Sequence, residues 1–170
     1  HRGMFTAAQV EQCINPPDFY HSPLTTLVEI ENTTNKGGGA CWDFEELKRI
    51  RTVCDTHNLG YHLDGARFWN ALVNTKETTE DYGQLFDTIS VCLSKGLGCP
   101  IGSVLIGNND IMKGAIRVRK ILGGGMRQVG YLAAAGMYAL DHHLDRLTDD
   151  HEKAKDIGKA LERLSIIISK

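Results

Sequence analysis

Long apolar runs and paired cysteine motifs are both missing from this 170-residue sequence. The longest apolar stretch, residues 131–140, falls well short of the roughly 20 residues that span a bilayer, so we expect no membrane association. The five cysteines are odd in number and show no C-x-x-C spacing, which argues against a disulfide framework and a zinc knuckle. We therefore expect reduced thiols, no metal site and a cytoplasmic protein.

An excess of charge of one sign is also missing. Nineteen Lys and Arg residues against twenty-one Asp and Glu residues give a net charge of −2 and a pI near 6.4. Such a balance creates no global field that would attract polyanions. A local basic cluster runs from Lys113 to Arg127, but no aromatic residue lies within it to stack on bases. We therefore expect no nucleic-acid partner.

The overall composition is that of a folded globular chain. Hydrophobic residues make up 42% of the sequence and charged residues 24%, close to the globular average, which excludes a disordered or collagen-like chain. The chain opens on His1 and stops just after residues 164–168, an isoleucine-rich run that predicts the beginning of a strand. We therefore expect a fragment of a longer chain.

Hydrophobic periodicity divides the chain into alternating strands and helices. Period-two or continuous apolar runs predict strands over residues 25–30, 61–63, 87–93 and 102–106. Three- and four-residue spacing predicts helices over residues 6–14, 43–57, 68–73, 110–122, 126–147 and 148–164. One helix between strands that begin about 30 residues apart is typical of β-α-β units. The sequence thus predicts an α/β fold with a mostly parallel sheet flanked by helices.

Two polar residues directly follow predicted buried strands, where ligands of parallel sheets bind. They are Asp64 and Lys95, 31 positions apart. Because adjacent strands lie about 4.8 Å apart, the two side chains can approach opposite sides of one small aromatic ring. Pyridoxal phosphate needs such a pair, an amine for its aldehyde and a carboxylate for its pyridine nitrogen. Alternatively, Asp64 caps the following helix and Lys95 is a solvated loop lysine, although Gly65 and Gly96 beside them favour close approach of a ligand.

Three segments resemble a known family. They are HLDGAR at residues 62–67, CLSKGLG at residues 92–98 and LGGGMRQ at residues 122–128. Together they are similar to the low-specificity L-threonine aldolases, fold-type I pyridoxal-phosphate enzymes of the beta-eliminating lyase group. The similarity extends along essentially the whole chain and includes Glu31-Asn32-Thr33 with the following Asn35.

The resemblance implies a role for five residues. Lys95 matches the lysine that forms the Schiff base with the cofactor, and Asp64 matches the aspartate on the pyridine nitrogen. Arg67 matches the arginine that contacts the cofactor edge and the substrate carboxylate, and Arg127 matches an arginine near the cofactor phosphate. His21 matches a histidine near the substrate β-hydroxyl, although a solvated loop histidine is the alternative.

The implied reaction is retro-aldol cleavage of threonine or allo-threonine to glycine and an aldehyde, in a homo-oligomer for which the family implies a tetramer. A base such as His21 removes the β-hydroxyl proton, while Arg67 fixes the substrate carboxylate bidentately. The open alternatives are a β-eliminating lyase on amino acids and a scaffold without cofactor.

Residues 1–170 are expected to form part of the large cofactor-binding domain. The upstream phosphate loop, the ring-stacking histidine, a downstream arginine and the small C-terminal domain have no counterpart in the sequence. We therefore expect the isolated fragment to be inactive.

Overall fold

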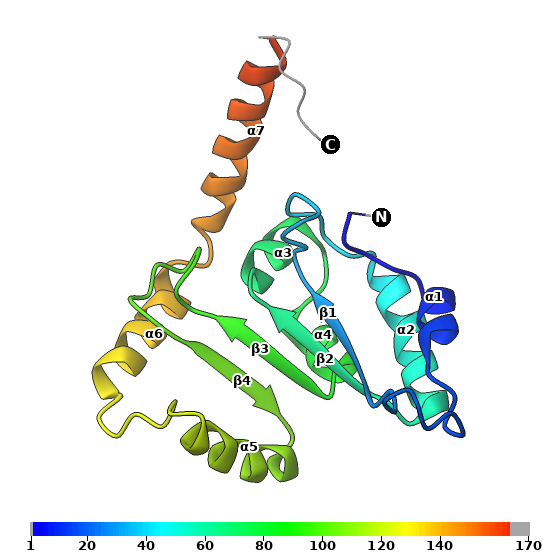
Figure 1. Ribbon diagram of the computed structural model, residues 1–170. Helices are drawn as coiled ribbons and strands as arrows, with labels where there is room; N and C mark the ends of the chain where they lie inside the picture. The colour runs from blue at the N-terminus through cyan, green and yellow to red at the C-terminus, as the bar shows by residue number, and fades with distance from the viewer. Residues whose placement is uncertain (1, 164–170) are drawn as a thin grey trace.

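Strands and helices alternate along residues 2–163, the part of the chain that the computed structural model describes (Figure 1). The strands are β1 (Leu27–Glu31), β2 (Gly60–Gly65), β3 (Thr88–Cys92) and β4 (Ser103–Gly107). The helices are α1 (Ala7–Cys13), α2 (Phe44–His57), α3 (Phe68–Asn74), α4 (Thr79–Leu85), α5 (Asn109–Ile121), α6 (Gly130–His142) and α7 (Leu147–Arg163). This arrangement confirms the predicted α/β class.

The four strands form one sheet in the order β1-β2-β3-β4. The first three are parallel, and their register places Glu31 beside Asp64 and Asp64 beside Ser90. β4 is antiparallel to β3. Only residues 93–102 connect β3 to β4, which is too short for the helical crossover that a parallel strand needs. The sheet is therefore mostly parallel, with one antiparallel edge strand.

Helix α2 begins and ends where its capping residues predict. The Asp43 side chain accepts a hydrogen bond from the Glu45 backbone N–H at 3.2 Å, and Asn58 adopts the left-handed conformation, with φ of 52°. Between these ends, one apolar stripe faces the sheet and is buried, comprising Leu47, Ile50, Val53 and Cys54. Burial of that stripe against β1 and β2 fixes the helix on one face of the sheet.

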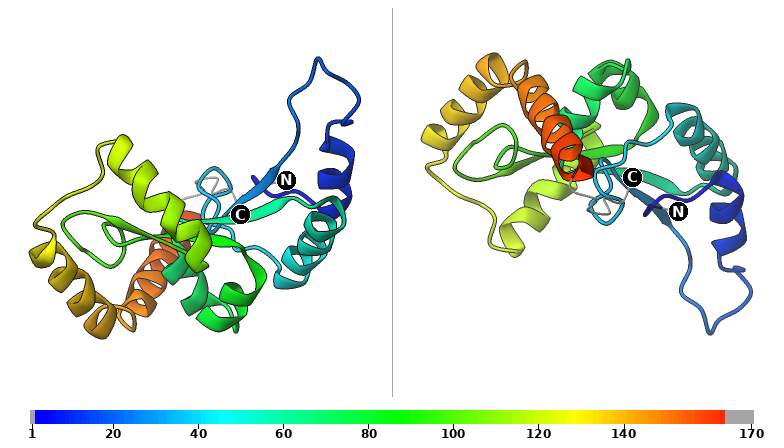
Figure 2. Two further views of the ribbon diagram at one scale, coloured as in Figure 1. Left: turned by 90° about the horizontal axis from the view of Figure 1, so that it is seen from below. Right: turned by 90° about the horizontal axis from the view of Figure 1, so that it is seen from above.

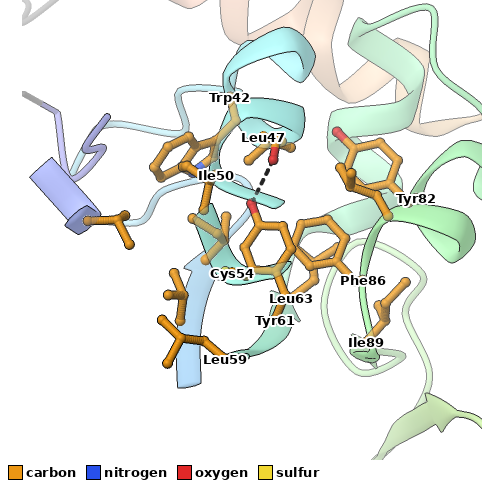
Figure 3. Packing of buried hydrophobic residues seen from close by; sticks show 14 of the residues in the cluster. Trp42, Leu47, Ile50, Cys54, Leu59, Tyr61, Leu63, Tyr82, Phe86 and Ile89 are labelled. Carbon is orange, nitrogen blue, oxygen red and sulfur yellow. Dashed lines mark hydrogen bonds between the residues drawn. The ribbon is translucent and has the colours of Figure 1, made fainter. Parts of the chain in front are cut away.

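The main core lies between α2, α4 and the same face of the three parallel strands (Figure 3). Alternate strand residues point into it, so Ile30 and Leu63 are fully buried neighbours. Tyr61 stacks on Phe86, with ring centroids 4.2 Å apart, and its hydroxyl donates to the Leu47 carbonyl at 3.4 Å. Burial raises the pKa of Tyr61 far above its ordinary value, so it stays a neutral phenol.

Figure 2 shows how the helices divide between the two faces of the sheet. α2, α3 and α4 lie on one face, and α5 lies on the other. Residues of β1, β2 and β3 that point away from the core, such as Glu29 and His62, are only partly covered or exposed. Among residues 2–163, no helix is both long and apolar enough to cross a bilayer.

The predicted secondary structure differs from the structure at two places, and one further predicted strand lies outside the described residues. α4 was not expected, because its sequence is mostly polar and only Tyr82 and Leu85 are buried. The helix predicted over 126–147 is shorter, from Gly130 to His142, and α7 already begins at Leu147 rather than after a Thr148 cap. The fully buried Leu147 anchors the turn between the two helices. The predicted strand at 164–168 lies outside the described residues.

Candidate active site

A pocket of about 380 Å³ lies where the carboxyl ends of the three parallel strands meet. The segments that follow β1, β2 and β3 each supply part of its wall, and α7 supplies one residue. Its lining comprises Thr33, Gly38, Gly39, Arg67, Asn70, Lys95, Gly96 and His151. Ligands of open parallel sheets bind at this edge, so the topology and the pocket indicate the same place.

The charge of the pocket is of one sign. Lys95 and Arg67 both line it, and no carboxylate is among its lining residues. An ammonium and a guanidinium in one cavity favour an anionic ligand, and the planar guanidinium binds a carboxylate or phosphate bidentately. A larger hollow of about 600 Å³ between β4 and α5 is lined mainly by apolar side chains and offers no comparable chemistry.

Arg67 is held by residues that follow or end β1. Its Nη2 donates to Asn35 Oδ1 at 3.1 Å, and its Nη1 lies 3.6 Å from Glu31 Oε1. Glu31 Oε2 also accepts a hydrogen bond from the Asn35 backbone N–H at 2.9 Å. The segment from Glu31 to Asn35 therefore has a structural task that its sequence did not reveal, because it orients the guanidinium beside the pocket.

The loop that carries Lys95 packs closely against α3 and α7. The Gly98 N–H donates to the Lys95 carbonyl at 2.8 Å, which closes a tight turn. A Cβ placed on Gly96 would lie 2.9 Å from Leu147 Cδ2 and 3.1 Å from Asn70 Oδ1. A side chain at this position would force Leu147 or Asn70 to shift, so the glycine beside Lys95 serves packing of the pocket wall.

Asp64 is the penultimate residue of β2 and is not among the residues that line the pocket. Leu63 and Gly65 point toward the core, so Asp64 lies on the opposite face of the sheet. Its Oδ1 accepts a hydrogen bond from the Ala66 N–H at 3.0 Å. The carboxylate therefore stabilises the turn after β2, and it does not cap α3, which begins at Phe68 with Arg67 as its N-cap residue.

The structure does not bring His21 or Arg127 to this pocket. His21 is exposed in the segment before the amino end of β1, whereas the pocket lies at the carboxyl end. Its ring lies tilted against that of Tyr20, with centroids 4.0 Å apart. This segment projects away from the rest of the chain (Figure 2). Arg127 is exposed between α5 and α6. The roles of both residues stay predictions.

Sequence reasoning missed three polar residues of the pocket, Thr33, Asn70 and His151. Thr33 belongs to the segment Glu31-Asn32-Thr33, which resembles the family, but the resemblance assigned no function to Thr33. Asn70 sits one helical turn after Arg67, so the i, i+3 spacing could have placed it on the same side. Nothing local in the sequence connects His151 with Lys95, because 56 positions separate them.

The pocket fits the predicted pyridoxal phosphate in its donor chemistry. The cofactor carries an aldehyde, which an amine can bond, and a phosphate, which cations can bind. Lys95 provides the amine and Arg67 the fixed cation. Gly38 and Gly39, with φ of 73° and 76°, leave the wall after β1 without side chains, which makes room for a flat ring.

Comparison with known proteins gives one family and a consistent set of relatives. The model of the beta-eliminating lyase family matches residues 1–170. The chain is 48% identical over 145 residues to the low specificity L-threonine aldolase of Escherichia coli O157:H7, covering 85% of this chain and 43% of that protein. It is 39% identical over 147 residues to the low specificity L-threonine aldolase of Saccharomyces cerevisiae, covering 86% of this chain and 37% of that protein.

Solved structures agree with the sequence comparison. The threonine aldolase of Leishmania major superposes with a TM-score of 0.88 at 27% identity, covering 99% of this chain and 50% of that one. The chain spans less than half the length of the curated relatives that it matches, between 43% and 46% for several of them.

Proposed function

This chain belongs to the beta-eliminating lyase family, and from that membership we propose that it is part of a pyridoxal-phosphate-dependent threonine aldolase. The proposed reaction is retro-aldol cleavage of threonine or allo-threonine to glycine and acetaldehyde. The relatives named above support this choice of substrate. The observation that carries the proposal is the shared pocket of Lys95 and Arg67 at the carboxyl ends of three parallel strands.

Four residues would hold the cofactor in this proposal. Lys95 bonds its aldehyde, Arg67 contacts its edge, Asp64 pairs with its ring nitrogen and Arg127 binds its phosphate. When bound, pyridoxal phosphate supplies a ring that accepts electrons from the substrate Cα. The register of Asp64 with Ser90 supports this role, because the two strands that precede Asp64 and Lys95 are neighbours in the sheet.

Arg67 would orient the substrate. Its contacts with Asn35 and Glu31 fix the guanidinium plane before any ligand binds, so little side-chain entropy is lost on binding. A carboxylate held bidentately by this plane has a defined direction, and the bonds of the substrate Cα are then fixed relative to the ring. Geometry of this kind decides which Cα bond breaks.

The remaining parts of the proposal concern the longer protein. Residues 1–170 would form part of a large cofactor-binding domain. His21 near the β-hydroxyl, a homo-oligomeric state and a cytoplasmic location are further parts of the proposal. Because both His21 and Arg127 lie away from the pocket of their own chain, their proposed roles need a second subunit.

The experiment uses the full-length protein with bound cofactor. Lys95→Ala is expected to abolish the visible absorbance of the bound cofactor and to lower threonine cleavage to background, because the anchoring amine is gone. Lys113→Ala is the matched control, since Lys113 is exposed on α5 and forms an ion pair with Asp110 on its own helix. Absorbance and cleavage that survive Lys95→Ala would overturn the proposal.

Product analysis separates the alternatives. A threonine aldolase releases glycine and acetaldehyde, whereas a β-eliminating lyase releases ammonia and a keto acid. A scaffold without cofactor shows neither products nor absorbance. Ammonia and a keto acid as the main products would move the assignment to the lyase reaction.

A further inference from the structure

His151 lines the pocket that holds Lys95, although it comes from a distant part of the chain. It lies on the second turn of α7, and the first residue of that helix, Leu147, is fully buried against the loop of Lys95. The His151 ring is half-buried, and its Nε2 lies 3.1 Å from the backbone carbonyl oxygen of Asn70 on α3. The imidazole is therefore fixed at the pocket wall by a contact between two helices.

This contact determines which ring nitrogen carries hydrogen. A carbonyl oxygen can only accept, so Nε2 must be the donor and carry the hydrogen. In the neutral ring, Nδ1 then has a free lone pair and can accept a proton. When Nδ1 is protonated, the Asn70 carbonyl also stabilises the resulting cation. A base whose second nitrogen is oriented by an acceptor is a recurring arrangement in catalytic sites.

Among the residues of this chain that line the pocket, His151 is the side chain suited to act as a base. The Arg67 guanidinium has donors and no acceptor, and the Asn70 amide and the Thr33 hydroxyl are not bases. Lys95 is occupied by the cofactor in the proposed function, and no carboxylate lines the pocket. The histidine predicted from the sequence, His21, lies beyond the opposite end of the strands.

Resting on the proposed function, we propose that His151 is a further residue of the active site and accepts the proton of the substrate β-hydroxyl. The proton moves from the hydroxyl oxygen to Nδ1 of His151. The electron pair of that O–H bond forms the carbonyl of the aldehyde, and the Cα–Cβ bond breaks. Its electron pair stays on the glycine fragment, at the carbon beside the electron-accepting ring of the cofactor.

The decisive variant is His151→Gln in the full-length holoenzyme. Glutamine can still donate an N–H to the Asn70 carbonyl, but it cannot accept a proton at neutral pH. We expect kcat for threonine cleavage to fall by at least about 100-fold, the usual contribution of a general base. Binding of glycine, followed by the change in cofactor absorbance, should stay unchanged because glycine has no β-hydroxyl. His142→Gln, on the exposed end of α6, is the matched control and should leave both unchanged.

The pH dependence of kcat gives a second test, because a variant that only folds less well would not lose the acid limb. Protonated His151 cannot accept a proton, so the wild-type kcat should fall toward acid, and this acid limb should be absent from His151→Gln. The charged groups that line the pocket with His151 are Lys95 and Arg67, and Glu31 contacts Arg67.

Three outcomes would overturn the assignment. They are a kcat within threefold of wild type, a loss of glycine binding by His151→Gln, and removal of the acid limb by His21→Gln instead. Loss of glycine binding would show that His151 only supports the fold. If wild-type protein cleaves threonine and His151→Gln cleaves it equally well, only this inference fails. If the wild type itself does not cleave threonine, the proposed function fails as well.

Discussion

The parallel half of the sheet and the segment from β4 to α6 differ strongly in how far their apolar side chains are buried. Strands β1 to β3 bury alternate residues against α2 and α4, and five of the largest buried side chains lie there, namely Tyr61, Ile30, Leu47, Ile50 and Leu63. In β4, four of five residues are exposed, and α5 buries none. In α6, only Gly136 and Ala139 are buried.

The difference shows that an apolar pattern can predict a helix or a strand without determining which other residues bury its apolar side chains. In β4, Leu105 and Ile106 pair with neighbouring residues of β3 in the sheet. Both side chains nevertheless stay nearly half exposed. α5 contacts β4 across the hollow of about 600 Å³, which leaves Ile116 and Leu122 largely in solvent. Contiguous exposed apolar surface of this kind is characteristic of regions that contact other protein.

The largest expected effect lies in the buried half. Leu47→Ala should lower the free energy of unfolding by about 2–5 kcal/mol, because it removes a fully buried side chain and leaves a cavity between α2 and β2. Urea unfolding measures the change. A loss below about 1 kcal/mol would mean that this half is packed no better than the segment from β4 to α6.

Gly65→Ala should have the next largest effect. An added Cβ would lie 2.4 Å from the Ser90 carbonyl oxygen and 3.0 Å from Phe68 Cβ, so β2 and β3 would have to separate. We expect a loss of about 1–3 kcal/mol, typical of overpacking. Gly83→Ala is the control, because nothing lies within 4 Å of its Cβ position in α4, and it should stabilise the helix by up to about 1 kcal/mol. Equal effects of the two changes would contradict the packing described for β2.

Glu46→Gln tests a smaller contribution, the attachment of α1 to the core through α2. The Ala7 N–H donates to Glu46 Oε1 at 2.7 Å, and this hydrogen bond, helped by Arg49, holds the pKa of Glu46 below its ordinary value. The unfolded state therefore binds the proton more tightly, so the stabilisation is present above pH of about 4.3 and is lost as the pH falls through the lower native pKa.

At neutral pH the substitution should cost up to about 1 kcal/mol, because the glutamine carbonyl can still accept from the Ala7 N–H and only the charge of the carboxylate is lost. The difference between wild type and Glu46→Gln, measured by urea unfolding, should shrink from pH 7 toward pH 3. A difference that grows toward acid would show that the carboxylate destabilises the native state.

The smallest effect is expected in the exposed half. Ile116→Ala on α5 should change the free energy of unfolding of the 170-residue chain by no more than about 0.5 kcal/mol, because 60% of the Ile116 side chain is exposed. The same urea experiment used for Leu47→Ala makes the two results directly comparable. If Ile116→Ala lowered the free energy of unfolding as much as Leu47→Ala, α5 would be packed more tightly than its exposure indicates.

Local pattern predicted most of the elements, because capping and periodicity act within a few residues. The Asp43 cap and the left-handed Asn58 lie where the sequence places the ends of α2. α4 escaped prediction since its capping residues, Thr78 and Asp81, precede too few apolar positions to show a helical period. The break between α6 and α7 also escaped, because it depends on contacts such as that of His143 Nδ1 with the Leu97 carbonyl at 2.6 Å.

By itself, the sequence determined the α/β class, the strand ends that present Asp64 and Lys95, and the glycines that allow close approach beside them. These features follow from short-range sterics and hydrophobic periodicity. Only the tertiary structure decided that Arg67 and Lys95 line one pocket, that Asp64 lies just outside that lining, and that His151 completes the wall. Such placements depend on how α3 and α7 pack against the end of the sheet, and packing between distant segments leaves no local trace in the chain.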